Sequence, residues 1–181
     1  QGSQKVGMGK EIYDNFTSAK IVFEEVNDSL NYDLSKIIFE GPAETLTMTE
    51  NAQPAIMSVS LAYLNVLVKE FNININNIKY FAGHSLGEYT ALGASKCLNI
   101  SEVSKLLHKR GKSMQNAVPL NVGAMAALMG AEFDDIKLIV DEIKKSYLCD
   151  IANYNTKTQI VLSGQKEAIS AAIDLAKEKK I

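Results

Sequence analysis

Histidine and cysteine are scarce in this chain, with only two of each among 181 residues. The histidines, His84 and His108, stand outside any cluster with ligand spacing, so the sequence offers no metal site. The cysteines, Cys97 and Cys149, lie far apart and form no C-x-x-C motif. We therefore expect free, buried thiols in a reducing compartment, the cytoplasm.

A surplus of charge and a long apolar run are lacking as well. The 19 basic and 21 acidic residues leave a net charge of −2. The basic residues are spread along the chain, so the sequence predicts no basic surface that would bind nucleic acid. No apolar run is long enough to span a bilayer, and no signal-peptide pattern opens the sequence. The sequence thus predicts neither a nucleic-acid partner nor a membrane partner.

The two ends of the chain indicate a piece of a longer protein. The chain begins at Gln1, without an initiator Met, in a polar segment that contains glycine. It stops at Ile181, where a new apolar segment would begin. We therefore expect the polypeptide to continue at both ends.

The segment Gly83-His84-Ser85-Leu86-Gly87 is the most informative motif in the chain. Residues 78–82 before it are mostly apolar and have the composition of a buried strand. Residues 86–98 after it are rich in Leu and Ala and predict a helix. A G-x-S-x-G segment between a strand and a helix is typical of the nucleophile elbow, although a structural turn is the alternative. The flanking glycines are expected because a Cβ at either position would clash.

Helices are predicted on the amino-terminal side of this motif. Thr17 is a candidate N-cap for a helix over 18–30, and residues 32–39 form a second helix that ends at Gly41-Pro42. Pro54 is expected to open a helix over 55–71 at its first turn, where the missing N–H costs nothing. This helix is apolar nearly all round, so we expect it inside a layered core. Gln53 at its start either caps it, lies in solvent or lines a pocket.

A helix over 101–117 carries an arginine on its apolar side. The stripe consists of Val103, Leu106, Leu107 and Met114, and Arg110 completes it. A buried guanidinium must be paired, either with a carboxylate or carbonyl of the protein or with an anionic ligand that its planar fork grips. Because a candidate nucleophile lies one helix away, a carboxylate-bearing substrate is favoured over a group of the protein as the partner of Arg110. His108 lies off the stripe and is expected at the surface.

From residue 121 the pattern changes to short strands and helices. Strands are predicted over 124–129, 149–153 and 159–163, and helices over 133–147 and 166–180. The order β-α-β-β-α lacks only a last strand, expected to start at Ile181, to match the ferredoxin-like pattern. We therefore predict two domains, a core over 1–120 that carries the elbow and an incomplete ferredoxin-like subdomain over 121–181.

Six short motifs are shared with one family of enzymes. They are Gln1-Gly2-Ser3-Gln4, Gly41-Pro42-Ala43-Glu44, Gln53-Pro54-Ala55, G-H-S-L-G-E-Y over 83–89, Arg110-Gly111 with Met114-Gln115, and Gly123-Ala124-Met125-Ala126-Ala127. With these motifs the chain resembles, along its whole length, the malonyl-CoA:acyl carrier protein transacylases of bacterial fatty-acid synthesis. G-x-S-x-G alone would also fit lipases and esterases, whereas the combination is far more specific.

The resemblance implies a fold and a set of site residues. The fold would be α/β, with a hydrolase-like parallel-sheet core next to the ferredoxin-like subdomain. Ser85 would be the nucleophile that takes the malonyl group as an ester, and the amides of Gln1 and Leu86 would form the oxyanion hole. Arg110 would hold the free malonyl carboxylate. The other residues implied to line the pocket are Gln53, Asn153 and Asn155.

The resemblance also implies the reaction and its partners. Malonyl-CoA would acylate Ser85, coenzyme A would leave, and the phosphopantetheine thiol of acyl carrier protein would attack the ester in a ping-pong cycle. No cofactor beyond the thioester substrate and no metal are expected. The protein is expected to be a monomer. The family's general base is a histidine, which here would lie beyond Ile181. His84 is a poor candidate, because a neighbour in a tight elbow points away from the serine.

Two alternatives stay open. The first is a serine hydrolase that acts on esters or thioesters, but a hydrolase of neutral acyl chains has no use for Arg110. The second is a non-catalytic domain that docks acyl carrier protein, and such a domain would gain no malonyl group on Ser85.

Overall fold

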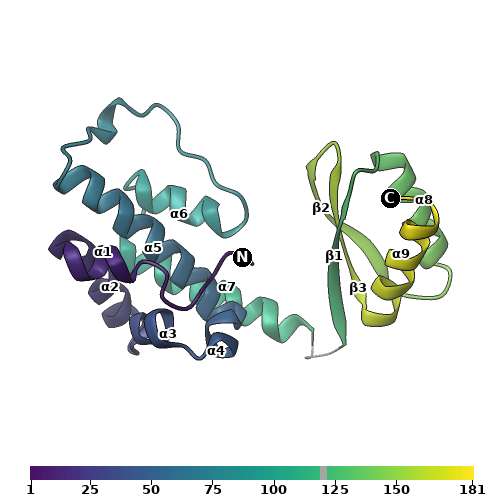
Figure 1. The fold of residues 1–181 in the computed structure, drawn as a ribbon, viewed down its shortest axis with the longest axis horizontal. Coiled ribbons are helices and arrows are strands. Elements are labelled where there is room, and N and C mark those ends of the chain that lie inside the picture. Colours follow the sequence, from purple (N-terminus) through teal and green to yellow (C-terminus); the bar gives the residue numbers. More distant parts are fainter. Residues whose placement is uncertain (119–121) are drawn as a thin grey trace. The chain divides into compact units, whose positions relative to one another are not determined.

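A computed structural model describes residues 1–118 and 122–181 of the chain (Figure 1). Within these ranges the chain divides into two compact units, Gln1–Asn116 and Ala117–Ile181. The domain boundary predicted between residues 120 and 121 lies outside the described residues.

The first unit is built from helices packed around one long central helix, α5 (Figure 1). Its elements are α1 (Lys10–Asn15), α2 (Thr17–Leu30), α3 (Leu34–Glu40), α4 (Ala43–Thr47), α5 (Thr49–Lys69), the 3-10 turn η1 (Ile75–Asn77), α6 (Leu86–Ala94) and α7 (Ile100–Ala117). The fully buried side chains of its core include Phe23, Leu34, Ile38, Met57 and Leu107. The helix predicted to be buried inside the core is therefore the one around which the unit is organised.

Two predicted helix starts are corrected by the structure. Phe16, with an extended backbone, occupies the cap position of α2, so Thr17 is the first helical residue instead of the cap. Helix α5 begins at Thr49, and Pro54 lies inside it, in the second turn, instead of opening it. A proline at this position leaves the carbonyl four residues earlier without its helical partner, so that carbonyl requires a donor from elsewhere.

The strand predicted over 78–82 is not formed. These residues have no regular secondary structure, and Tyr80 among them is 87% exposed. A strand requires a neighbouring strand to exchange backbone hydrogen bonds, and in the described part of the first unit no strand is present to pair with it. The parallel sheet expected for the core is likewise not formed within the described residues.

The second unit is a three-stranded antiparallel sheet with two helices on one face (Figure 1). Its elements are β1 (Gly123–Met129), α8 (Phe133–Ile143), β2 (Cys149–Thr156), β3 (Gln159–Gln165) and α9 (Lys166–Glu178). The strand order is β1-β3-β2, with both pairs antiparallel, as in a split β-α-β unit. Leu128, Ile160 and Leu162 of the sheet form a core with Ile136, Ile139 and Ala172 of the helices. The five elements predicted from residue 121 onward are confirmed, with shifted ends.

The two cysteines have different surroundings. Cys149 is buried as predicted, and burial raises the pKa of its thiol. Cys97 is exposed, contrary to the prediction. The helix predicted to run to residue 98 ends at Ala94, and Lys96 adopts a left-handed φ of 63° that a continuing helix excludes. Cys97 therefore lies in the turn after α6.

Candidate active site

Ser85 stands at the sharp turn that leads into α6. Its backbone has φ 56° and ψ −115°, a conformation that residues with a side chain rarely adopt. Two backbone hydrogen bonds hold the turn, from the Gly87 N–H to the His84 carbonyl at 2.9 Å and from the Glu88 N–H to the Ser85 carbonyl at 3.2 Å. Ser85 is exposed. The turn presents its hydroxyl at the start of a helix, as the motif predicted.

Only one of the two flanking glycines is required by sterics. A Cβ on Gly83 would lie 2.0 Å from the carbonyl carbon and oxygen of Gly87, and 2.7 Å from the Glu88 nitrogen. A Cβ on Gly87 would meet nothing within 4 Å. The prediction of a clash is therefore right for Gly83 and wrong for Gly87, because Gly87 faces a pocket.

Arg110 reaches Ser85 from α7. Its Nη2 donates to the Ser85 Oγ over 3.2 Å, and its Nη1 donates a short hydrogen bond to the Gln53 Oε1. The guanidinium carbon lies 5.8 Å from the centre of the Tyr89 ring, within the range of a cation–π interaction. Among the described residues, no carboxylate forms an ion pair with Arg110. Neutral groups hold the guanidinium, so its positive charge is available to an anionic ligand.

Arg110 lies at the border of the buried face of α7. That face consists of Val103, Ser104, Leu107 and Gly111. Leu106 and Met114, assigned to the apolar stripe by the sequence, are 42% and 45% exposed. The face is rotated because Gly111 lets the α7 backbone contact that of α5. The border position allows Arg110 to be partly buried and still reach an exposed serine.

Gln53 is fully buried, and both ends of its amide have partners. Its oxygen accepts from Arg110, and its Nε2 donates to the Met114 sulfur at 3.4 Å. Met48 holds the cap position of α5, so neither a capping role nor a solvent-exposed position applies to Gln53. Gln53 fixes one edge of the guanidinium.

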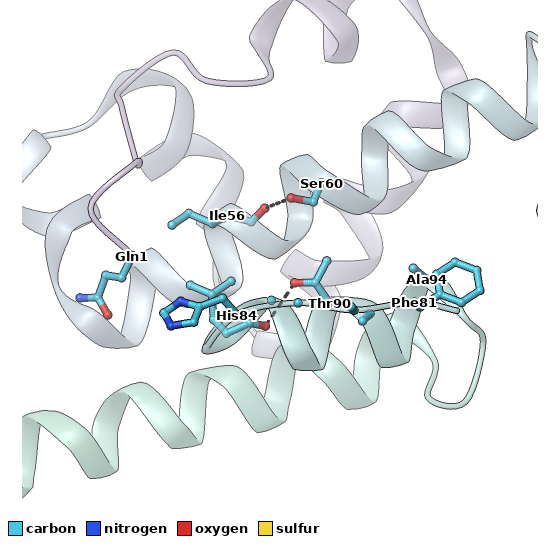
Figure 2. Close-up of a pocket in the computed structure, with 12 residues that line it drawn as sticks. Gln1, Ile56, Ser60, Phe81, His84, Thr90 and Ala94 are labelled. Atoms are coloured by element: carbon cyan, nitrogen blue, oxygen red, sulfur yellow. Dashed lines mark hydrogen bonds between the residues drawn. The ribbon is translucent and has the colours of Figure 1, made fainter. Parts of the chain in front are cut away.

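A pocket of about 320 Å³ lies beside the turn (Figure 2). Its lining includes Gln1 and Leu86, the residues whose amides the family resemblance implies for the oxyanion hole. The Leu86 N–H belongs to the first turn of α6, where amides have no partner within the helix. The Thr90 hydroxyl donates to the Leu86 carbonyl over 3.3 Å (Figure 2), and the Gln1 Nε2 donates to the Thr49 hydroxyl over 3.2 Å. The structure thus brings Gln1 and Leu86 to one pocket.

Asn153 and Asn155 lie on β2 in the second unit. Asn153 is opposite Val161 of β3, and the Asn155 Nδ2 donates to the Gln159 Oε1 over 3.0 Å. Both side chains are partly buried. Their place in a pocket together with Ser85 stays a prediction.

The two histidines lie in different surroundings. His84 is exposed and lines the pocket beside the turn. His108, expected at the surface, is partly buried, with its Nδ1 3.1 Å from the Glu50 carbonyl oxygen. Within residues 1–118 and 122–181, no three His, Cys, Asp or Glu side chains gather in a group that could hold a metal ion. In the same ranges, none of the helices has the length and apolar character needed to cross a membrane.

Two residues that contact this site, Tyr89 and Met114, were not predicted to belong to it. Tyr89 lies four residues after Ser85 on α6, and Met114 lies four residues after Arg110 on α7. Side chains at this spacing share a helix face. This four-residue spacing was the sequence signal for Tyr89 and Met114. It could not show which face of α6 or α7 lies at the site.

An exposed serine on a strained turn at a helix start, beside a free cation, is typical of acyl transfer through a serine ester. All of residues 1–181 match the acyl transferase domain family, so the chain belongs to this family. A malonyl CoA-acyl carrier protein transacylase of Bacillus subtilis (strain 168) is 44% identical over 179 residues, which are 98% of this chain and 55% of that protein. The chain thus spans about half the length of the curated relatives it matches.

Solved structures of similar proteins agree with this assignment. An acyl-carrier-protein-S-malonyltransferase from Bartonella henselae has 46% identity and a TM-score of 0.92, over 99% of this chain and 57% of that one. A malonyl-transacylase in complex with a type II PKS acyl-carrier protein has 35% identity and a TM-score of 0.90, over 99% of this chain and 57% of that one. The α/β fold class predicted from the sequence is confirmed by this similarity.

Proposed function

We propose that the protein transfers a malonyl group from malonyl-CoA to the phosphopantetheine thiol of acyl carrier protein, with Ser85 as the carrier of the group. One observation supports this substrate above others. The Nη2 of Arg110 lies 3.2 Å from the Ser85 Oγ, and no described carboxylate neutralises it. The malonyl group carries a carboxylate one methylene away from its thioester carbonyl, so a cation beside the nucleophile suits it.

In the first half of the reaction the Ser85 Oγ attacks the thioester carbonyl carbon. A C–O bond forms, and the carbonyl oxygen becomes an oxyanion that the amides of Gln1 and Leu86 stabilise. The C–S bond then breaks, coenzyme A leaves, and the malonyl group stays on Ser85 as an ester. The serine proton passes to a general base, the histidine expected beyond Ile181, which hands it to the sulfur of the departing coenzyme A. In the second half the base takes the proton of the carrier thiol, and the sulfur attacks the ester carbonyl carbon. A C–S bond forms, the C–O bond to Ser85 breaks, and the base returns the proton to the serine oxygen.

Arg110 exchanges partners during this cycle. Before substrate binds, its Nη2 donates to the Ser85 hydroxyl. The malonyl carboxylate then replaces the hydroxyl, because its negative charge attracts the guanidinium whereas the hydroxyl is neutral. Gln53 keeps the other nitrogen in place through both states. Asn153 and Asn155 complete the pocket in this proposal.

The setting of the reaction follows from its chemistry. Both substrates are thioesters or thiols, and the chain holds free cysteines, which suits a reducing cytoplasm. The thioester is already activated, so we include no cofactor and no metal in the proposal. We also propose that the protein acts as a monomer.

Mass measurement of the full-length protein after incubation with malonyl-CoA tests this function. The wild type should gain one malonyl group and lose it when holo acyl carrier protein is added, whereas Ser85→Ala should gain none. Ser170→Ala, at an exposed position of α9, is the matched control and should behave as the wild type. No mass gain by the wild type would favour a docking domain. An ester that water removes as fast as the carrier protein would favour a hydrolase.

A further inference from the structure

Pro54 leaves one backbone carbonyl of α5 without its usual partner. In a regular helix the N–H of residue 54 would donate to the Glu50 carbonyl, but proline has no N–H. His108 of α7 approaches this oxygen, with its Nδ1 3.1 Å away. A carbonyl oxygen only accepts hydrogen bonds, so the Nδ1 of His108 carries the proton. A side chain of α7 thus replaces a backbone bond of α5.

Tyr32, in the turn between α2 and α3, supports the imidazole. Its hydroxyl lies 3.4 Å from the His108 Nδ1 and donates to the Asn51 Oδ1 over 2.9 Å. Asn51 in turn donates to the Thr45 carbonyl over 2.9 Å. Burial, and next the Glu50 carboxylate, raise the pKa of Tyr32 to about 12, so this hydroxyl keeps its proton. The Nδ1 of His108 therefore lies near two oxygens, the Glu50 carbonyl and a Tyr32 hydroxyl whose proton is already donated to Asn51.

Gly111, three residues after His108, contacts the same residue of α5. A Cβ on Gly111 would lie 2.5 Å from both the Glu50 Cα and the Thr49 carbonyl oxygen. Two helix backbones therefore meet here with no side chain between them. Residues three apart lie on one helix face, so His108 and Gly111 fasten the same face of α7 to the start of α5.

Arg110 lies between these two contacts in the sequence. Its partner Gln53 lies three residues after Glu50 on α5 and is fully buried, so a shift of α7 would change the contact between the two side chains. The crossing of the helices at Glu50 thus decides where the guanidinium meets Gln53 and Ser85. In catalysis a misplacement of about 1 Å can lower a rate about 10²-fold.

We propose that His108 is a positioning residue for Arg110. It holds α7 against the start of α5, and the guanidinium consequently stands beside Ser85. This inference rests on the proposed function, in which Arg110 binds the malonyl carboxylate. It follows that His108 matters more for acceptance of a carboxylate-bearing acyl group than for acylation of Ser85 in general.

The experiment measures the acylation rate of Ser85 in the full-length protein, with malonyl-CoA and with acetyl-CoA. His108→Leu removes the donor and should lower the malonyl-to-acetyl ratio about tenfold or more, since a shift below 1 Å suffices. His108→Asn places an amide N–H where Nδ1 lies and should restore the ratio. Lys105→Leu, at an exposed position of the same helix, is the matched control and should keep the wild-type ratio. An unchanged ratio in His108→Leu overturns the proposal.

A double variant separates positioning from plain stabilisation. Pro54→Ala returns the missing N–H to α5 and so satisfies the Glu50 carbonyl without the imidazole. In the His108→Leu, Pro54→Ala protein, the unfolding temperature should recover while the ratio stays low. Recovery of both would mean that His108 only satisfies a carbonyl, which overturns the proposal.

Two further measurements cover the remaining outcomes. If His108→Leu does not fold, nitrogen NMR of the wild-type ring decides, because an Nδ1–H tautomer supports the contact and an Nε2–H tautomer overturns it. Arg110→Ala tests the proposed function separately. If it lowers malonyl and acetyl transfer equally, the carboxylate-binding role itself fails, whatever the His108 variants do.

Discussion

The two units of this chain are stabilised in different ways. The second unit is a small sheet covered by two helices, and its buried residues are almost all apolar. The first unit buries polar side chains as well, among them Gln53, Ser58 and Ser104. Its candidate active site is a set of hydrogen bonds between helices that lie far apart in the sequence, such as Arg110 with Gln53.

This difference separates residues that maintain a fold from residues that perform chemistry. A buried polar group must be satisfied, so it is retained only where the fold supplies a partner. In the first unit the buried Gln53 accepts from Arg110, which also donates to the exposed Ser85, and no described carboxylate pairs with this cation. In the second unit the described contacts serve packing and strand pairing. Substitutions in each unit test this contrast.

The largest expected effect is on catalysis, at Arg110. Replacing Arg110 by Ala removes the proposed carboxylate partner and should lower malonyl transfer about 10²- to 10³-fold, as loss of a charge-stabilising group typically does. Acetyl transfer should change little, because an acetyl group has no carboxylate. Steady-state rates with both thioesters measure this, with Lys109→Ala as the exposed neighbouring control. Equal losses for the two substrates would contradict the role of Arg110.

Leu162 tests whether the second unit depends on apolar packing alone. Its side chain is fully buried in the middle of β3, so Leu162→Ala should lower the free energy of unfolding by about 2–5 kcal/mol. Met129→Ala, at a position 59% exposed, is the control and should have a small effect. Hydrogen exchange followed by mass spectrometry should show faster exchange in residues 122–181 and little change in 1–118. Equally faster exchange in both ranges would show that the two units unfold together, which would contradict their separate stabilisation.

The glycines of the elbow provide a matched pair within the first unit. Gly83→Ala forces a Cβ onto the backbone of Gly87 and should destabilise the protein by about 1–3 kcal/mol. Gly87→Ala meets nothing within 4 Å and lies in a helix, so it should be neutral or stabilising by up to about 1 kcal/mol. Urea unfolding of both variants measures the difference. Equal costs would mean that the turn is not as tight as the structure shows.

The smallest effect is expected at Asp33, the N-cap of α3. Its carboxylate accepts from the Ser35 hydroxyl at 2.7 Å and from the Lys36 N–H at 2.8 Å, and these two bonds hold its pKa below 3.8. Asp33→Ala should cost about 1 kcal/mol of stability at neutral pH. A lowered pKa stabilises the fold above the ordinary value, so this contribution should disappear as the pH falls through the pKa of the folded state.

Unfolding of wild type and Asp33→Ala at several pH values measures that change. Asp33→Asn is the matched control, because an amide oxygen can cap the helix but does not titrate in this range. A difference between wild type and Asp33→Ala that stays constant into the acid range would contradict the carboxylate cap.

Local sequence patterns predicted the second unit well. Its strands alternate in burial, its helices repeat at helical spacing, and β2 and β3, which pair, are joined by a short turn. The strand predicted over 78–82 shows the limit of such reasoning. Its apolar composition is that of a strand, but strand formation depends on a neighbouring strand, and composition cannot show whether one lies alongside.

Local patterns were also insufficient at the crossing of α5 and α7. The missing N–H of Pro54 suggested a helix start, but His108, 58 positions from Glu50 in the chain, supplies the hydrogen bond that the Glu50 carbonyl lacks. The sequence placed His108 at the surface because this residue lies off the apolar stripe of its helix. Nothing in the sequence around Gly111 indicated that the backbones of α5 and α7 touch there. This contact places the buried face of α7 at a different angle from the predicted apolar stripe.

The sequence by itself determined that a serine stands on a sharp turn before a helix, because the G-x-S-x-G spacing and its glycines act within a few residues. It also determined that an arginine on a mostly apolar helix requires a partner, because a buried charge is unstable alone. Only the tertiary structure decided that these two residues meet. Their contact joins positions 25 apart in the chain, and it depends on the crossing of helices whose backbones touch at Gly111, a property that no local pattern encodes.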